Sequence, residues 1–129
     1  MSSHGLTRMH DAAVTVRRAV PGDLATLQGF EQGIIAAERP YDPTIRKDPV
    51  QYYDIAALIA SDDVFVAIAE AGGGAIGCGF ARKSASPSFI EPPQHAYVGL
   101  IYVASEFRGR GVSRLILDAL STWAREKKL

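Results

Sequence analysis

The sequence has a single cysteine, Cys78, among its 129 residues, and this scarcity excludes several kinds of protein. One thiol cannot form an internal disulfide or a multi-cysteine zinc site, which fits a reducing compartment. No apolar run approaches the roughly 20 residues that a membrane-spanning helix needs. The segment from Met1 to Ala13 also lacks the long apolar stretch of a signal peptide. We therefore expect a cytoplasmic protein with no membrane partner.

An excess of charge of either sign is missing as well. Fourteen Lys and Arg residues balance fourteen Asp and Glu residues, so no overall field favours nucleic acid, and we expect no such partner. The hydrophobic share of 47% is ordinary for a globular protein, and 129 residues suit one domain with a core of useful size. We expect a flexible leader over residues 1–12 and one domain over residues 13–129.

Hydrophobic patterns predict an α/β (α+β) domain with the element order β-α-α-β-β-β-α and a mostly antiparallel sheet. Glycines 72–74 predict the turn of a hairpin between the second and third strands. The final helix has the clearest pattern, because six apolar residues from Val112 to Trp123 recur at helical spacing. The expected strands cover 14–18, 64–69, 75–83 and 97–103, and the expected helices cover 21–38, 50–60 and the segment from residue 112 onward.

A buried strand, a glycine-bearing turn and the start of this helix follow one another without a break. The turn reads Arg108-Gly109-Arg110-Gly111-Val112-Ser113. Such a turn directs backbone N–H groups to the positive end of the helix dipole, where a phosphate or pyrophosphate binds well. Glycine side chains leave room for the anion, and the two arginines add charge. The Lys-Ser/Thr pair of a nucleotide-binding P-loop and the third glycine of a Rossmann fingerprint are both missing.

This turn resembles the Gln/Arg-x-x-Gly-x-Gly/Ala signature of the GCN5-related N-acetyltransferases, with Ser113 standing where that family prefers Gly or Ala. The strand Tyr97–Val103 resembles the family's fourth strand. The resemblance implies acetyl-CoA as cosubstrate, with its pyrophosphate held by amides of residues 108–113. It also implies that the main chain of the strand pairs with the pantetheine arm. The candidate coenzyme-binding residues are Ile101, Tyr102, Val103, Arg108, Gly109, Arg110, Gly111, Val112 and Ser113.

The implied reaction is transfer of an acetyl group to a primary amine of a small molecule or peptide by direct attack. Many members carry an acidic residue on the fourth strand to take the amine proton, but Gly99 stands there in this sequence. Glu38 and Tyr97 are the candidate catalytic residues, and His95 is also considered as a base. Each has a simpler explanation: Glu38 as a solvated helix end, His95 as a loop residue and Tyr97 as strand packing.

Other interpretations remain open at this stage. Gly99 favours an alternative function, a non-catalytic coenzyme A-binding fragment or pseudoenzyme. Tyr41, Tyr52 and Tyr53 could line an acceptor pocket or clamp the second helix. The sequence stops where the family would run into a fifth strand, so we expect a C-terminally incomplete fold. We then expect one of two situations: the chain is a fragment of a longer protein, or a second copy covers the exposed strand edge in a homo-oligomer.

Overall fold

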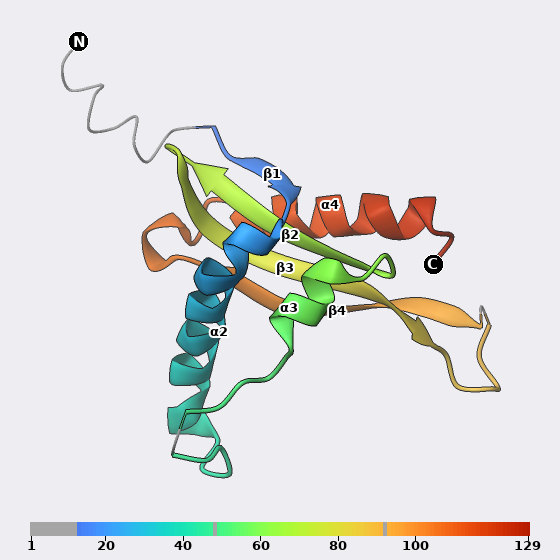
Figure 1. The fold of residues 1–129 in the computed structure, drawn as a ribbon, viewed down its shortest axis with the longest axis horizontal. Coiled ribbons are helices and arrows are strands. Elements are labelled where there is room, and N and C mark those ends of the chain that lie inside the picture. Colours follow the sequence, from blue (N-terminus) through green and yellow to red (C-terminus); the bar gives the residue numbers. More distant parts are fainter. Residues whose placement is uncertain (1–12, 48, 92) are drawn as a thin grey trace.

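The computed structural model describes residues 13–47, 49–91 and 93–129 and shows an antiparallel sheet flanked by helices (Figure 1). The predicted order β-α-α-β-β-β-α is confirmed, and the expected leader, residues 1–12, lies outside the described residues. Three short 3-10 helices adjoin the main elements: η1 (Pro21–Asp23), η2 (Arg39–Tyr41) and η3 (Ser105–Phe107). The main elements are β1 (Thr15–Arg18), α2 (Leu24–Glu38), α3 (Ile55–Ala60), β2 (Val64–Ala71), β3 (Gly74–Ala85), β4 (Gln94–Val103) and α4 (Val112–Glu126).

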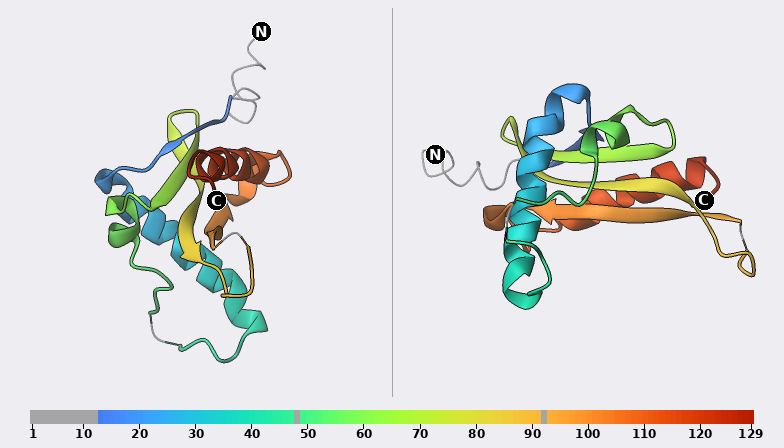
Figure 2. Two further views of the ribbon diagram at one scale, coloured as in Figure 1. Left: turned by 90° about the vertical axis from the view of Figure 1, so that its right-hand side faces the viewer. Right: turned by 60° about the horizontal axis from the view of Figure 1, so that its bottom comes forward.

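The four strands lie in the order β1-β2-β3-β4, and each neighbouring pair is antiparallel. Strands β2 and β3 form the expected hairpin, whose two-residue turn consists of Gly72 and Gly73 at φ values of 60° and 81°. A tight hairpin turn of this kind requires positive φ at both residues, which glycine adopts without a steric penalty. Strand β4 therefore lies at one edge of the described sheet, and β3 and β4 extend beyond the shorter strands (Figure 2).

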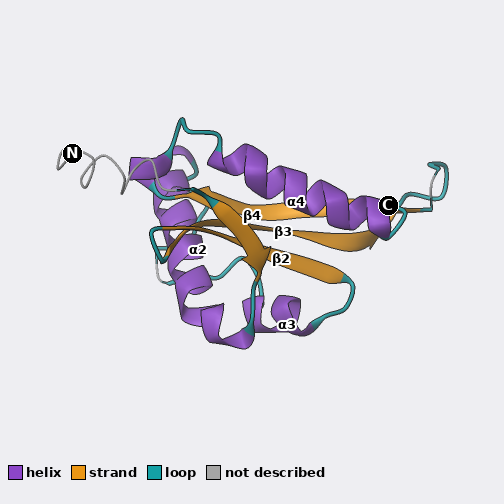
Figure 3. Cartoon of the chain, turned by 90° about the horizontal axis from the view of Figure 1, so that it is seen from above, coloured by secondary structure: helices purple, strands orange, loops and turns teal. Residues whose placement is uncertain are grey.

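Helices cover both faces of the sheet, with α2 and α3 on one face and α4 on the other (Figure 3). Two cores form because alternate side chains of β2 point to opposite faces of the sheet. Val66 and Ile68 join the core beneath α2 and α3, whereas Ala67 and Ala69 join the core beneath α4. The small alanines allow α4 to pack closely on the second face.

Helix α4 buries most of the apolar stripe that the sequence predicts, but Leu115, which the pattern also placed in the stripe, is 41% exposed. Val112, Ile116, Leu120 and Trp123 are each at most 6% exposed and pack on the sheet. Each large apolar side chain contributes about 1.5–3 kcal/mol of stability when fully buried, so the stripe anchors the helix firmly. This anchoring fixes the position of the turn that precedes α4.

The second helix is shorter than predicted. It begins at Ile55 rather than at residue 50, because the Asp54 side chain accepts a hydrogen bond from the Ala57 N–H at 3.2 Å and caps the helix there. Ile55 is buried, whereas Ala57, which the prediction placed inward, is exposed. Tyr53 consequently lies before the helix, in an irregular segment over residues 49–54.

Strand β4 contains a β-bulge. Cys78 of β3 pairs with Tyr102, but Phe80 pairs with Gly99, so two residues of β4 lie opposite one residue of β3. Leu100, one of these two, adopts a φ of 56°, which is uncommon for a residue with a side chain. A bulge bends a strand and redirects its side chains, and such bulges are frequent next to functional sites. The bulged residues Leu100 and Ile101 border one pocket, and Val103, two residues further along β4, borders another.

Candidate functional site

The first pocket lies where β4 passes into α4. Gly109 and Gly111 have φ values of 76° and 80°, a conformation that favours glycine. Gly111 is the N-cap of α4 and has no side chain that could cap the first turn, so the N–H groups of residues 112–114 are free of intrahelical acceptors. A pocket of about 250 Å³ lies at this end of the helix. Its lining comprises Val103, Phe107, Arg108, Gly109, Gly111, Val112 and Ser113.

The two arginines of the turn differ in their relation to this pocket. Arg108 lines it, donates a hydrogen bond from Nε to the Val103 carbonyl at 2.8 Å, and holds its guanidinium 5.6 Å from the Tyr102 ring centre. Arg110 is exposed and outside the pocket lining. A ligand that pairs with the Val103 carbonyl would compete with Arg108 for it. The guanidinium would then be released beside the bound anion.

The three predicted strand residues point to different faces of the sheet. Ile101 and Val103 pack against the core beneath α4, whereas the Tyr102 ring stacks on Phe30 of α2 with the ring centres 5.1 Å apart. A Cβ atom on Gly33 would lie only 3.0 Å from Tyr102 Cε1, so this glycine permits the close approach of α2 to β4. Tyr102 therefore links α2 to the strand by its side chain, and its main chain pairs with β3.

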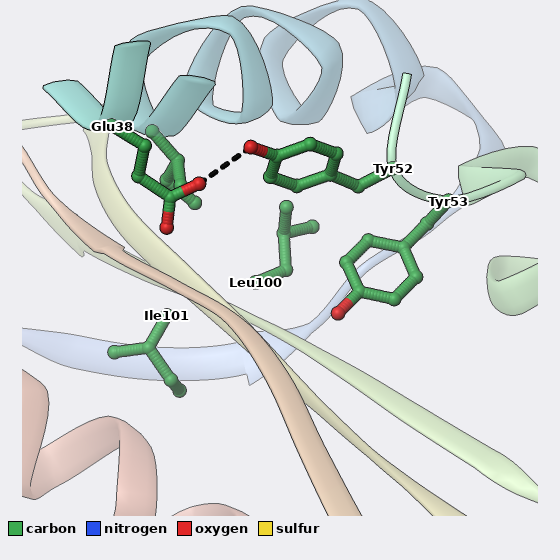
Figure 4. Close-up of a pocket in the computed structure, with 6 residues that line it drawn as sticks. Glu38, Tyr52, Tyr53, Leu100 and Ile101 are labelled. Atoms are coloured by element: carbon green, nitrogen blue, oxygen red, sulfur yellow. Dashed lines mark hydrogen bonds between the residues drawn. The ribbon is translucent and has the colours of Figure 1, made fainter. Parts of the chain in front are cut away.

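A second pocket, also about 250 Å³, lies beside the bulge, whose residues Leu100 and Ile101 form part of its lining (Figure 4). Among the described residues, Glu38 at the end of α2 is the only charged one in its lining. The Tyr52 hydroxyl points at Glu38 and donates a hydrogen bond to Oε1 at 2.5 Å, which raises the pKa of Tyr52 and keeps its proton in place. The lining comprises Ile34, Glu38, Tyr52, Tyr53, Leu100 and Ile101.

Tyr97, the other candidate catalytic residue, lies outside the lining of this pocket but reaches it through Tyr53. The two hydroxyl oxygens are 3.2 Å apart, and the Arg82 guanidinium lies 4.5 Å from the Tyr97 ring centre. Burial, followed by the hydrogen bond to Tyr97, raises the pKa of Tyr53 to about 12. The Tyr53 hydroxyl therefore keeps its proton near pH 7 and acts as a neutral hydrogen-bonding group.

His95 and Tyr41 do not join either pocket. His95 Nδ1 lies 3.0 Å from Ser86 Oγ, across the β3–β4 hairpin and away from the bulge, and Tyr41 is 89% exposed. Of the three tyrosines considered for an acceptor pocket, Tyr52 and Tyr53 line the second pocket. The sequence placed both within the expected helix 50–60, where clamping of that helix was their alternative role, whereas the structure places them before the helix.

Gly99 has a structural role that the sequence did not reveal. A Cβ atom at this position would lie 2.8 Å from the Tyr53 hydroxyl oxygen and 2.9 Å from Phe80 Cζ, closer than real side chains approach. The Tyr53 ring packs edge-on against Phe80 with the ring centres 4.9 Å apart. The Tyr53 hydroxyl therefore occupies the space into which a side chain at position 99 would project.

Glu31 is a second residue that sequence reasoning missed. Its side chain is fully buried in α2, and Oε2 accepts hydrogen bonds from the Tyr52 and Tyr53 N–H groups at 3.0 Å each. A signal did exist in the sequence. Glu31 lies four residues from both Leu27 and Ile35, so it falls within the apolar stripe of the helix.

Cys78 is a core residue, not a nucleophile. Its side chain is fully buried, and Sγ lies 3.2 Å from the Leu100 carbonyl oxygen, to which the thiol donates. Burial raises the pKa of the thiol to about 12, so the reactive thiolate is not formed near neutral pH.

Across the described ranges, no cluster of His, Cys, Asp and Glu side chains could hold a metal ion. Among the same residues, no helix has the length and apolar character needed to cross a bilayer.

The glycine turn at the start of α4, set on a bulged strand of an antiparallel sheet, defines the class of fold that the sequence signature implied, an acetyltransferase fold. Residues 32–129 match the model of the Acetyltransferase (GNAT) family. The chain belongs to this family. No curated protein matches the sequence.

Solved structures show the same fold at low sequence identity. An acetyltransferase from Vibrio fischeri aligns with a TM-score of 0.72 and 18% identity, covering 88% of this chain and 88% of that chain. A predicted acetyltransferase from Clostridium acetobutylicum, solved with acetyl-CoA, aligns with a TM-score of 0.67 and 18% identity over 91% of this chain and 77% of that one. A GCN5-related N-acetyltransferase from Ralstonia eutropha JMP134 has a TM-score of 0.67 and 15% identity, with 91% and 79% coverage.

Proposed function

We propose that the domain over residues 13–129 transfers an acetyl group from acetyl-CoA to a primary amine of a small molecule or peptide. The observation that carries this proposal is the path of β4, which borders both pockets. Leu100 and Ile101 line the pocket beside Glu38, and Val103 lines the pocket at the glycine turn. A ligand with an anionic part at the turn can therefore extend along the strand edge toward the other pocket.

The turn fits the pyrophosphate of coenzyme A. The first-turn amides of α4 and the helix dipole attract an anion, and Arg108 at the pocket adds a positive charge. Around Gly109 and Gly111, no heavy atom lies within 4 Å of the position that a Cβ atom would take, so the space above the turn is open. The acetyl thioester supplies an activated carbonyl carbon. The protein orients it by main-chain contacts along β4.

Glu38 is proposed to take the proton of the attacking amine. An amine with a pKa of about 10 is neutral only to about one part in 10³ at pH 7, and this deficit corresponds to about 4 kcal/mol without a base. In the reaction, the amine nitrogen forms a bond to the carbonyl carbon, the carbon–sulfur bond breaks, and the thiolate of coenzyme A leaves. The attacking ammonium gives up two protons in all: one passes to Glu38 and from there to solvent, and the other ends on the leaving thiolate, which is released as the thiol of coenzyme A. The Glu38 carboxylate also attracts the cationic substrate before reaction.

Tyr97 has a supporting role in this proposal. Its hydroxyl lies 3.2 Å from that of Tyr53, which lines the second pocket. We assign this pocket, which Glu38 also lines, to the amine and call it the acceptor pocket. The pair offers two hydroxyl groups that can hydrogen-bond to a polar substituent of the acceptor. Neither tyrosine is proposed as the base, since Glu38 is the only lining residue that can carry a negative charge near pH 7.

The test is release of coenzyme A thiol from acetyl-CoA in the presence of a panel of primary amines, with the product identified by mass. We expect amine-dependent thiol release, and a loss of about 10²-fold in kcat for Glu38→Gln, the size typical of a general base. Glu126→Gln is the control, since Glu126 is exposed at the far end of α4. Calorimetric binding of coenzyme A without acetylation of any amine would favour the non-catalytic alternative.

A further inference from the structure

Glu31 is the one charged side chain within the buried core of the described residues. Burying a carboxyl group is unfavourable unless its oxygens find hydrogen-bond donors. Oε2 has two such donors, the N–H groups of Tyr52 and Tyr53, each at 3.0 Å. An apolar residue at this position would extend the helix stripe at no such penalty. The carboxyl group therefore needs an explanation beyond core packing.

The donors belong to a segment that lacks other backbone support. Residues 49–54 lie in no helix or strand, and their N–H groups have no sheet or helix partner. Helix α2 holds this segment at three points, because Gln32 Nε2 also donates to the Val50 carbonyl at 2.8 Å. Glu31 supplies two of the three hydrogen bonds, and they are the two that are shielded from solvent.

The two residues held in this way are the tyrosines of the second pocket. Tyr52 directs its hydroxyl to Glu38, and Tyr53 directs its hydroxyl toward the strands (Figure 4). There the Tyr53 hydroxyl meets that of Tyr97. Adjacent residues of an irregular segment project in different directions. One oxygen that binds both N–H groups therefore sets the directions of both side chains together.

We propose that Glu31 is a positioning residue of the acceptor pocket, which fixes the Tyr52–Tyr53 pair relative to Glu38 and β4. The proposal rests on the function proposed above, because it assigns the second pocket to the acceptor. Glu31 does not line that pocket and acts only through the two tyrosines. It determines the shape and hydrogen-bonding pattern that an amine meets, but not the affinity for acetyl-CoA.

The test compares Glu31→Met, which removes the acceptor at similar volume, with Glu31→Gln, which keeps an oxygen for the two N–H groups. Leu27→Val is the matched control, since Leu27 is fully buried on the same helix but lines neither pocket. The probe is n-butylamine, a small cation with an apolar body. Three quantities are measured: hydrogen exchange of the Tyr52 and Tyr53 amides, the KM and kcat for n-butylamine, and the Kd for acetyl-CoA.

We expect Glu31→Met to speed exchange of both amides at least tenfold and to raise the KM for n-butylamine at least tenfold. The Kd for acetyl-CoA should stay within twofold of the wild-type value. In Glu31→Gln, the amide exchange rates and the KM for n-butylamine should stay within about threefold of the wild-type values. Leu27→Val should change neither of these two quantities selectively. A folded Glu31→Met protein with an unchanged KM would show a merely structural role and overturn the proposal.

Two further outcomes also test the proposal that Glu31 positions the two tyrosines. If Glu31→Met does not fold, exchange in the wild-type protein decides: Tyr52 and Tyr53 amides that exchange as fast as those of the exposed residues Ser88 and Phe89 would overturn the proposal. If the wild-type protein acetylates no amine, the proposed function fails separately. Binding of n-butylammonium, followed by the tyrosine ring signals in NMR spectra, then replaces KM as the measure of the pocket in each variant.

Discussion

The glycine turn and the acceptor pocket border the same strand, but the protein builds them in different ways. The turn takes its parts from one stretch of chain over residues 105–114: a 3-10 helix, two glycines at positive φ, and the first turn of α4. The acceptor pocket collects residues from α2, the irregular segment 49–54 and β4. It also depends on Glu31 and Gly99, which lie outside its lining.

This difference governs how each region should respond to substitution. A local turn is disabled by a change in one of its own residues, and the rest of the molecule is unaffected. A pocket assembled from distant segments can be altered by a residue that never touches the ligand, because that residue sets the position of one that does. The two regions should therefore vary independently: coenzyme binding with the turn, and acceptor binding with the contacts behind the tyrosines.

Among substitutions that separate the two regions, the largest effect is expected for Gly111→Val. A branched side chain at a φ of 80° both strains the turn and projects into the space where the pyrophosphate would approach. We expect the affinity for coenzyme A, measured by calorimetry, to fall at least tenfold, or about 1.4 kcal/mol. The KM for the amine at saturating acetyl-CoA should change little.

Gly73→Val provides a matched control for backbone strain. Gly73 has a φ of 81° in the β2–β3 hairpin and, like Gly111, no heavy atom within 4 Å of its Cβ position. Both variants should lose about 1–3 kcal/mol of stability, but only Gly111→Val should lose coenzyme A. Ser113→Gly should be mild, because the residue stays small and its amide is kept. If Gly111→Val and Gly73→Val bind coenzyme A with equal affinity, the glycine turn is not part of the coenzyme-binding site.

A smaller effect, confined to the other region, is expected for Gly99→Ala. The added methyl group would meet the Tyr53 hydroxyl at 2.8 Å and the buried Phe80 ring at 2.9 Å, so Tyr53 must move. We expect a stability loss of about 1–3 kcal/mol from overpacking and a severalfold rise in the KM for the amine. The affinity for coenzyme A should stay within twofold.

Gly29→Ala is the control for this substitution. Gly29 is exposed in α2 with nothing near its Cβ position, so alanine there should stabilise the helix by about 1 kcal/mol. Thermal melting and steady-state kinetics on both variants check the prediction. A Gly99→Ala protein with reduced affinity for coenzyme A and an unchanged KM for the amine would contradict the separation of the two regions.

The sequence predicted those features that neighbouring residues determine. The α4 stripe from Val112 to Trp123, the hairpin at Gly72 and Gly73, and the glycine turn were all foreseen, because each follows from local spacing or φ requirements. The predicted start of the second helix, at residue 50, was wrong. The Asp54 side chain accepts a hydrogen bond from the Ala57 N–H and so begins α3 at Ile55, and this cap outweighed the apolar pattern of residues 50–54.

The acceptor pocket was only partly predictable. Glu38 was a candidate because it ends a helix, but its hydrogen bond with Tyr52 joins residues 14 positions apart. The contact of Tyr53 with Tyr97 spans 44 positions, and the crowding at Gly99 depends on both Tyr53 and Phe80. Such contacts depend on the packing of α2 and the 49–54 segment on β4. No local pattern in the sequence specifies that packing.

The central claim is that acetyl-CoA lies along β4 with its pyrophosphate at the turn of residues 108–113. The most direct measurement is a titration of the isotope-labelled protein with coenzyme A, followed by backbone amide chemical shifts. The account predicts that the largest shifts occur at Gly109, Gly111, Val112 and Ser113, with smaller ones along residues 101–103 and little change over residues 72–74. Saturation with coenzyme A that leaves the amides of the turn unshifted would contradict the account.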